Sequence, residues 1–286
     1  MSAFIAILLG LVQGLTEFLP VSSTAHLTLA ENLLLKRSMP LAFDVLLHVG
    51  TLLALIVYFR AEISRMVRGL LGRDEEGRRL AVWIIVAMVP TVIFGFGTRH
   101  LKQTAKEHLW VYGVCLLLTA GLLYAANRLA SRREGRALHR MGLLDAVAVG
   151  TIQGLGGGFG LSRSGSTISM GVFRGLQLPA AARFSFLLGI PTILGAAVLE
   201  GAHILKPILR HQPLPPEMAF PQGGLGPAAA CALGVAAAAV SGYLAISLLD
   251  RFTRRPRLVP FAAYCVAAGI LMTILGLKGG GAAPLP

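Results

Sequence analysis

Residues 10–15 of this chain read Gly-Leu-Val-Gln-Gly-Leu, and residues 150–155 read Gly-Thr-Ile-Gln-Gly-Leu. The two segments agree at four of six positions with an offset of 140 residues, and at the same offset Ser22 falls on Ser162. Such a repeat indicates that the chain consists of two related halves, each containing one copy of the segment.

Each copy of the repeated segment lies in an apolar region that is interrupted near its middle. The regions are about 3–35 and 141–180, and glycine, proline and hydroxyl residues interrupt them at 18–23 and 156–162. A continuous lipid-facing helix does not tolerate such backbone, which occurs at membrane depth only where protein shields it or where it lines a wet cavity. We therefore predict two re-entrant helix–loop–helix hairpins.

The composition is that of a membrane protein. Residues of the set AVILMFWYC make up 55% of the 286 residues, only 14% are charged, and the mean hydropathy is +0.71. Soluble domains have about 25% charged residues, so these values exclude an ordinary cytosolic enzyme, a disordered chain and a disulfide-stapled secreted module. Six apolar stretches are long enough to cross a bilayer of about 30 Å, at about 42–59, 80–98, 109–127, 184–205, 225–250 and 258–277.

The order of these segments predicts an inverted repeat. Each half, about 1–128 and about 141–278, has one hairpin followed by three spans, and an odd number of crossings inverts the second half relative to the first. In proteins with this plan the broken helices meet near the middle of the bilayer and form the functional site. The expected fold is an all-α polytopic membrane protein, with six transmembrane helices and two re-entrant hairpins in a single membrane domain over residues 1–286.

The basic residues predict how the chain is oriented. The net charge is +13, from 26 Lys and Arg against 13 Asp and Glu. Loops on one side of the six spans carry 17 Lys and Arg, and those on the other side carry 8. The richer side is expected to be cytoplasmic, which places both termini and the first hairpin outside. Because the basic residues lie in short loops between apolar spans, we do not expect the positive charge to bind nucleic acid.

Three ionisable residues lie in or near the interruptions: Glu17, His26 and Arg163. Ionisable groups at membrane depth are costly and are therefore candidates for function. If the repeat brings the hairpins together, these groups share one cavity with hydroxyl side chains, namely Ser22, Ser23, Thr24, Ser162, Ser164, Ser166 and Thr167. The alternative is a buried Glu17–Arg163 ion pair that only fastens the two hairpins together.

The second interruption has the features of an anion site. Residues 160–167 read Gly-Leu-Ser-Arg-Ser-Gly-Ser-Thr and precede an apolar helix. A glycine-rich turn that opens a helix presents free backbone N–H groups and the positive end of the helix dipole. An arginine adds a fork of donors that suits phosphate oxygens. The pattern predicts an oxyanion or phosphate site.

The first interruption is more distinctive. Residues 13–26 read Gln-Gly-Leu-Thr-Glu-Phe-Leu-Pro-Val-Ser-Ser-Thr-Ala-His, and residues 162–167 read Ser-Arg-Ser-Gly-Ser-Thr. Both segments resemble the signature motifs of the undecaprenyl-diphosphate phosphatase family, integral membrane enzymes that are also linked to bacitracin resistance. Residues 43–51 and 184–191 are similar to that family too, and the resemblance covers essentially the whole chain in the family's order.

The resemblance implies roles for individual residues. Glu17 matches the acid tied to metal binding or water activation, Ser23 the serine nucleophile, and His26 the histidine for proton transfer. Arg163 matches the phosphate-binding arginine. The implied substrate-binding residues are Ser22, Thr24, Ser162, Ser164, Gly165 and Thr167. Ser23 and His26 lie three apart and would share one face of a helical turn. A covalent phosphoserine and direct attack by metal-bound water both remain open.

Other positions adjust this resemblance. Gln13 stands where the family often has an acid, which weakens a metal site with two carboxylates, and Ala25 replaces the usual glycine. We expect Gln13, Asp44 and His48 to lie around the catalytic residues and to contact those residues rather than the substrate. Asp44 and His48 lie four apart on the first span and so point the same way. The alternative for this pair is a helix cap at Asp44 and an interhelical hydrogen bond at His48.

The function implied by the resemblance is hydrolysis of undecaprenyl diphosphate to undecaprenyl phosphate and inorganic phosphate, which recycles the lipid carrier for cell-wall synthesis. The implied cofactor is a divalent metal ion, Mg²⁺ or Ca²⁺, with Glu17 as a ligand. The expected location is the bacterial inner membrane, with the active site opening outward. Expected partners are the polyprenyl diphosphate lipid and the bilayer, no nucleic acid, and a second copy of the chain as a candidate for a homodimer. The rival function is a transporter or flippase for a polyprenyl phosphate, because inverted repeats with broken helices are common in transporters.

Overall fold

The computed structural model describes residues 2–35, 39–98, 108–157, 160–209 and 226–278. Within these ranges the chain is helical and has no strand, only an isolated bridge between Arg136 and Leu176. The first elements are α1 (Ala3–Phe18), α2 (Ser23–Ala30), the π-helix η1 (Glu31–Leu35), α3 (Leu41–Tyr58), α4 (Arg60–Leu70), α5 (Glu75–Gly97) and α7 (Leu109–Ala130). The remaining elements are the 3-10 helix η2 (Leu138–Arg140), α8 (Leu143–Gly156), α9 (Arg163–Phe173), α10 (Leu178–Leu209), α11 (Pro227–Thr253) and α12 (Val259–Lys278).

Six of the described helices are long and apolar enough to cross a membrane, and they are α3, α5, α7, α10, α11 and α12. Each overlaps one of the six predicted spans, so the all-α polytopic fold is confirmed. Helix α5 begins at Glu75 and α10 begins at Leu178, several residues earlier than predicted. The first turns of these helices extend beyond the apolar run, and hydropathy alone does not mark them.

The basic segment 60–79, expected to be a loop, contains the additional helix α4. Its last turn meets the first turn of α5 at Gly69 and Gly77, where an added Cβ would clash with the facing backbone. Arg65 of α4 pairs with Asp74 at 3.1 Å and with Glu76 at 2.7 Å. These contacts fold α4 back against α5, and a search for long apolar runs does not detect so polar a helix.

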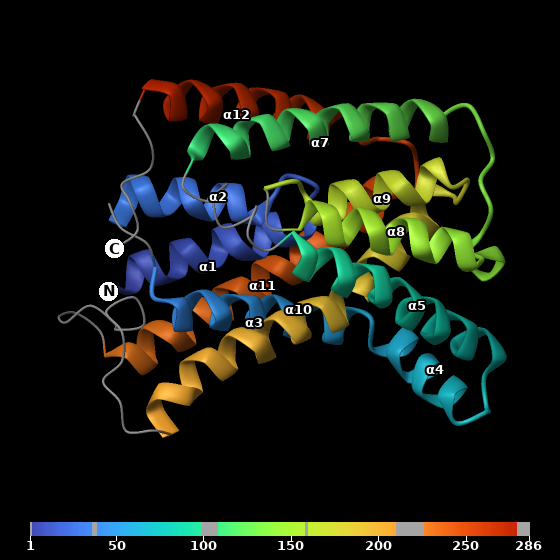
Figure 1. Ribbon diagram of the computed structural model, residues 1–286, viewed down its shortest axis with the longest axis horizontal. Coiled ribbons are helices and arrows are strands. Elements are labelled where there is room, and N and C mark those ends of the chain that lie inside the picture. The colour runs from blue at the N-terminus through green and yellow to red at the C-terminus, as the bar shows by residue number, and fades with distance from the viewer. Residues whose placement is uncertain (1, 36–38, 99–107, 158–159, 210–225, 279–286) are drawn as a thin grey trace.

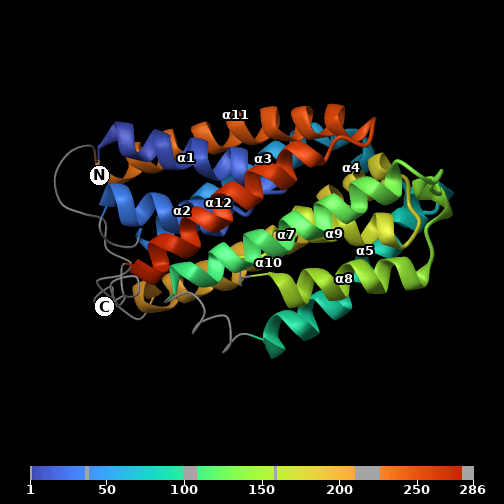
Figure 2. The same cartoon turned by 90° about the horizontal axis from the view of Figure 1, so that it is seen from above.

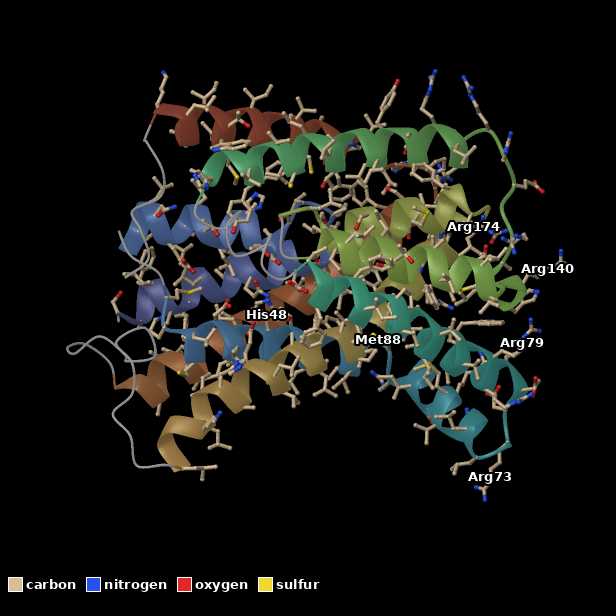
Figure 3. The ribbon with its side chains drawn as sticks, viewed as in Figure 1. His48, Arg73, Arg79, Met88, Arg140 and Arg174 are labelled. Carbon is tan, nitrogen blue, oxygen red and sulfur yellow. The ribbon has the colours of Figure 1, made fainter. Side chains whose placement is uncertain are left out.

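The two hairpins enter the bundle from opposite ends. The start of α1 and the end of α12 lie at one end of the molecule, and α1 and α2 extend from that end toward the middle (Figure 1). Helices α8 and α9 extend toward the middle from the other end, as the view in Figure 2 also shows. The arginines labelled in Figure 3 all lie at the end opposite to the start of α1, and they are Arg73, Arg79, Arg140 and Arg174.

The repeated segment packs in the same way in both halves. At Gly10 of α1 and at Gly150 of α8, an added Cβ would clash with the backbone of the facing helix, α11 or α5. A hydroxyl of that facing helix donates to the same glycine carbonyl, from Ser241 to Gly10 at 3.5 Å and from Thr91 to Gly150 at 3.0 Å. Small residues allow this close approach of helices in membranes. The same kind of close helix contact therefore occurs at both copies of the repeated segment.

A cluster of buried aromatic rings fixes the end of α1. Phe18 packs edge-on against Phe186 of α10, with 6.1 Å between ring centroids, and Phe59 approaches the same ring at 5.8 Å. All three side chains are buried. The cluster holds the residues next to Phe18 against α10, and these residues include Glu17.

Candidate active site

The first hairpin turn places two serines at the start of α2. Helix α1 ends at Phe18 because Pro20 disfavours helical backbone at the residue before it. Ser22 caps α2, and its Oγ accepts a hydrogen bond from the backbone N–H of Ala25 at 3.4 Å. Ser22 has a φ of 70° and is the only non-glycine residue of the described ranges with a positive φ. Strain of this kind clusters at functional sites, and it brings Ser23 to the first position of α2.

The second turn has the same construction. Ser162 caps α9, and its Oγ accepts from the N–H of Gly165 at 3.1 Å. Ser22 and Ser162 occupy the same position of the repeat, so the residues that follow them are also equivalent. The first position of α2 is therefore Ser23, and the first position of α9 is Arg163.

The starts of α2 and α9 meet inside the bundle. The hydroxyl of Ser164 donates to the carbonyl of Leu19 in the first turn at 3.1 Å. Arg163 Nη2 donates to Glu17 Oε1 at 2.7 Å and joins the two hairpins by an ion pair. Each helix start carries a partial positive charge and unpaired N–H groups. Two positive helix ends and a guanidinium group therefore converge on one place, as predicted from the repeat.

Glu17 occupies the centre of this place. Its Oε1 accepts from Arg163, and its Oε2 accepts from Ser23 Oγ at 2.7 Å and from Gln13 Nε2 at 3.2 Å. The side chain of Glu17 is 8% exposed, so the ionised carboxylate depends on these donors rather than on water. The carboxylate of Glu17 is thus an anion bound between the hydroxyl of Ser23 and the guanidinium group of Arg163.

Helix α10 forms the wall behind Arg163. Arg163 Nη1 donates to the carbonyl of Ser185 at 3.5 Å, and a Cβ added at Gly189 would stand 2.6 Å from the same nitrogen. The hydroxyls of Ser185 and Thr167 lie 2.6 Å apart and tie α10 to α9. Neither Ser185 nor Gly189 was predicted to belong to the site. The available signal was that both belong to residues 184–191, a stretch that is similar to the family.

His26 does not contact Ser23 in the way that the spacing suggested. Its Nδ1 lies 2.8 Å from the carbonyl oxygen of Ser22, and its Nε2 lies 2.7 Å from the hydroxyl of Tyr264 on α12. Ser23 instead donates to Glu17. A shared helical face fixes which side chains point in one direction, and the neighbouring helices decide which of them meet. Tyr264 was missed because it is 238 residues away in sequence.

The hydroxyl groups predicted to belong to the site differ in their exposure. Ser162, Ser164 and Thr167 are at most 1% exposed. Their hydroxyls bond within the protein, from Ser162 to Ser164 at 3.3 Å and from Thr167 to the carbonyl of Arg163 at 2.7 Å, so in this state they shape the turn. Ser23 and Thr24 are partly exposed and can reach a ligand.

Asp44 and His48 form a pair beside the site. His48 Nδ1 lies 2.9 Å from the carbonyl oxygen of Asp44 and 3.6 Å from its carboxylate. His48 is on α3 (Figure 3). Asp44 lies in the first turn of α3, where a negative charge is favourable.

Comparison with known proteins decides the family. Residues 6–271 match the family described as bacitracin resistance protein BacA, a range that contains every residue of the site. The chain belongs to this family. The undecaprenyl-diphosphatase of Syntrophotalea carbinolica is 39% identical over 273 residues, which cover 94% of this chain and 97% of that protein. That of Trichlorobacter lovleyi is 40% identical over 281 residues (95% and 97%), and that of Rubrobacter xylanophilus is 39% identical over 279 residues (94% and 97%).

The oxygen atoms of this BacA-family site show which residues could bind the implied metal ion. Within the described ranges no three His, Cys, Asp or Glu side chains are grouped to hold a metal ion. Glu17 supplies a carboxylate, and Oε1 of Gln13 is buried without a hydrogen-bond partner. Mg²⁺ prefers oxygen ligands and often shares its coordination between one or two carboxylates and substrate phosphates. These two residues fit a cation that binds together with the phosphate of the substrate.

Proposed function

We propose that this chain hydrolyses undecaprenyl diphosphate to undecaprenyl phosphate and inorganic phosphate, and so returns the lipid carrier to cell-wall synthesis. The undecaprenyl-diphosphatases described above share 39–40% of their residues with it over nearly their whole length. The site supports the same reaction, because it combines an anion-binding place, a hydroxyl group and a carboxylate base within a membrane bundle.

One observation carries the proposal. The carboxylate of Glu17 is held between Ser23 at the start of α2 and Arg163 at the start of α9, 2.7 Å from each. A place that holds one anion between helix starts and a guanidinium group is suited to a phosphoryl group. The hydroxyl of Ser23 already donates to a carboxylate, which is the arrangement of an activated nucleophile with its base.

In the proposed reaction Ser23 attacks the terminal phosphorus. Glu17 Oε2 takes the proton as Ser23 Oγ forms its bond to phosphorus, and the bond from phosphorus to the bridging oxygen breaks. Undecaprenyl phosphate leaves with the electron pair of that bond. Water then attacks the phosphoserine, His26 accepts a proton of that water, and inorganic phosphate leaves as Ser23 regains its hydrogen from Glu17.

The proton transfer to Glu17 also changes the electrostatics of Arg163. While Glu17 is ionised, it competes with phosphate for the guanidinium, from which it is 2.7 Å away. Once it carries the proton of Ser23, this competition ends and Arg163 is free to neutralise the charge on the phosphoryl oxygens. Charge stabilisation of this kind is usually the largest contribution to catalysis.

The metal ion has a supporting place in this scheme. A divalent cation held by Glu17, by Oε1 of Gln13 and by phosphate oxygens would neutralise part of the diphosphate charge. The amide of Gln13 also donates to Glu17 Oε2 at 3.2 Å and orients the carboxylate toward Ser23.

The arrangement in the membrane completes the proposal. The four arginines labelled in Figure 3 lie at the end opposite to the start of α1 and the end of α12. This supports a cytoplasmic position for that end and an external position for both termini. The hairpins then re-enter from opposite faces of the bacterial inner membrane, and their turns meet within it. The first hairpin, which carries Glu17, Ser23 and His26, comes from the outer face, which supports a site that opens outward while the isoprenoid chain stays in lipid.

A phosphate-release assay tests this function. Purified chain in detergent with Mg²⁺ is given undecaprenyl diphosphate, and we expect inorganic phosphate and undecaprenyl phosphate in equal amounts. Glu17→Gln, which keeps the size of the side chain, should lower the rate by at least about 100-fold. Absence of phosphate release from correctly folded wild-type protein would contradict the proposal and would favour the rival function, transport of a polyprenyl phosphate.

A further inference from the structure

The contact between His26 and Tyr264 joins the first hairpin to α12. The hydroxyl of Tyr264 lies 2.7 Å from His26 Nε2, and the two rings are nearly parallel, with 17° between their planes. The neighbouring residue Cys265 donates from Sγ to the carbonyl of Pro20 in the first turn at 3.3 Å. Helix α12 thus touches the first hairpin both at its turn and at its histidine.

The direction of each hydrogen bond follows from the chemistry of the partners. The carbonyl oxygen of Ser22, 2.8 Å from His26 Nδ1, can only accept. Nδ1 must therefore carry a hydrogen. In a neutral imidazole the other nitrogen, Nε2, then has a lone pair, and the hydroxyl of Tyr264 must donate to it. The carbonyl of Ser22 and the hydroxyl of Tyr264 together select the tautomer of neutral His26 that carries its hydrogen on Nδ1.

We propose that Tyr264 is a positioning residue for the reaction, whose hydroxyl holds His26 in the Nδ1–H form with Nε2 as the nitrogen that accepts protons. This inference rests on the proposed role of His26 in proton transfer. Because the lone pair of Nε2 faces the hydroxyl of Tyr264, a proton of the attacking water enters at the phenol oxygen while the hydrogen of Tyr264 passes to Nε2. Nε2 then donates, and the phenol oxygen accepts. The contact therefore exists in both protonation states of His26, and the ring keeps its orientation through the cycle.

A double-mutant cycle with Tyr264→Phe and His26→Ala tests the inference. The phenylalanine keeps the ring and removes only the hydroxyl. We expect Tyr264→Phe to lower kcat by about tenfold, the effect of losing one hydrogen bond to the reacting group, with KM nearly unchanged. In the His26→Ala background the same substitution should change kcat by less than about twofold, because residues that act as a unit are not additive.

The control is Tyr243→Phe on α11. Tyr243 is also half exposed in a membrane span, and its ring packs on Tyr58 rather than on the site, so its rate should equal that of the wild type. Melting temperatures in detergent establish that each variant is folded. An equal loss from Tyr264→Phe in both backgrounds would overturn the inference and leave the role of His26 intact. Wild-type turnover by His26→Ala would instead show that the proposed role of His26 is wrong, and the inference with it.

Discussion

A single methyl group at Gly189 should slow the enzyme strongly without unfolding it. A Cβ at this position would stand 2.6 Å from Arg163 Nη1 and 3.2 Å from Cζ, whereas ordinary contact begins near 3.4 Å. The guanidinium must therefore shift by about 0.8 Å, and the displaced atoms are the end of a flexible side chain rather than backbone. Because a displacement of about 1 Å at a reacting site can cost about 100-fold in rate, we expect Gly189→Ala to lower kcat by about 10- to 100-fold.

The matched control is Gly195→Ala on the same helix, where an added Cβ has nothing within 4 Å. Both substitutions replace glycine by alanine inside α10, so both should raise or preserve helix stability by about the same amount, up to about 1 kcal/mol. Phosphate release from undecaprenyl diphosphate gives kcat, and melting in detergent gives stability. Equal turnover of the two variants would refute the reasoning. A lower melting temperature for Gly189→Ala alone would show that the backbone of α10 moves instead of Arg163.

Three further outcomes follow from single contacts. Arg163→Lys should have the melting temperature of the wild type and a kcat about 100-fold lower, because lysine keeps the charge but lacks the fork of donors. Wild-type turnover would show that charge alone suffices. Buried Asp145 binds the half-exposed Arg136 at 2.9 Å and Arg174 at 3.1 Å. Asp145→Ala should therefore lower the free energy of unfolding by about 1–3 kcal/mol and leave kcat per folded molecule unchanged. An unchanged denaturation midpoint would contradict this. Gln13→Glu should lower the Mg²⁺ concentration for half-maximal rate, since it adds a second carboxylate beside Glu17, and an unchanged Mg²⁺ titration would remove Gln13 from the cation site.

The features that sequence predicted well are those set by local chemistry. Long apolar runs gave the six spans, and the proline and glycine residues near Ser22 and Ser162 marked both turns. The offset between Gly10 and Gly150 gave the repeated interface, because close helix packing needs small residues at fixed positions. The cost of isolated charges at membrane depth pointed to Glu17 and Arg163, which the structure joins at 2.7 Å.

The features that sequence missed depend on which helices become neighbours. The face of α2 that carries His26 was clear, but Tyr264 reaches it from the last helix of the chain. Ser23 turns toward α1 and so meets Glu17 instead of His26. Gly189 has no chemistry of its own, and only the packing of α10 against Arg163 gives it significance. Helix α4 escaped detection because its sequence is too polar for a span.

The central claim is that Ser23, activated by Glu17, attacks phosphorus, and the turnover of Ser23→Ala tests it most directly. Ser22→Ala is the matched comparison, because Ser22 caps α2 and its hydroxyl bonds to the backbone N–H of Ala25 rather than to Glu17. At equal expression and equal Mg²⁺ concentration, we expect Ser23→Ala to lose several orders of magnitude in kcat and Ser22→Ala to lose less. A Ser23→Ala enzyme within about tenfold of the wild type, a barrier change of only about 1.4 kcal/mol, would contradict the account and would indicate that water attacks the phosphorus directly.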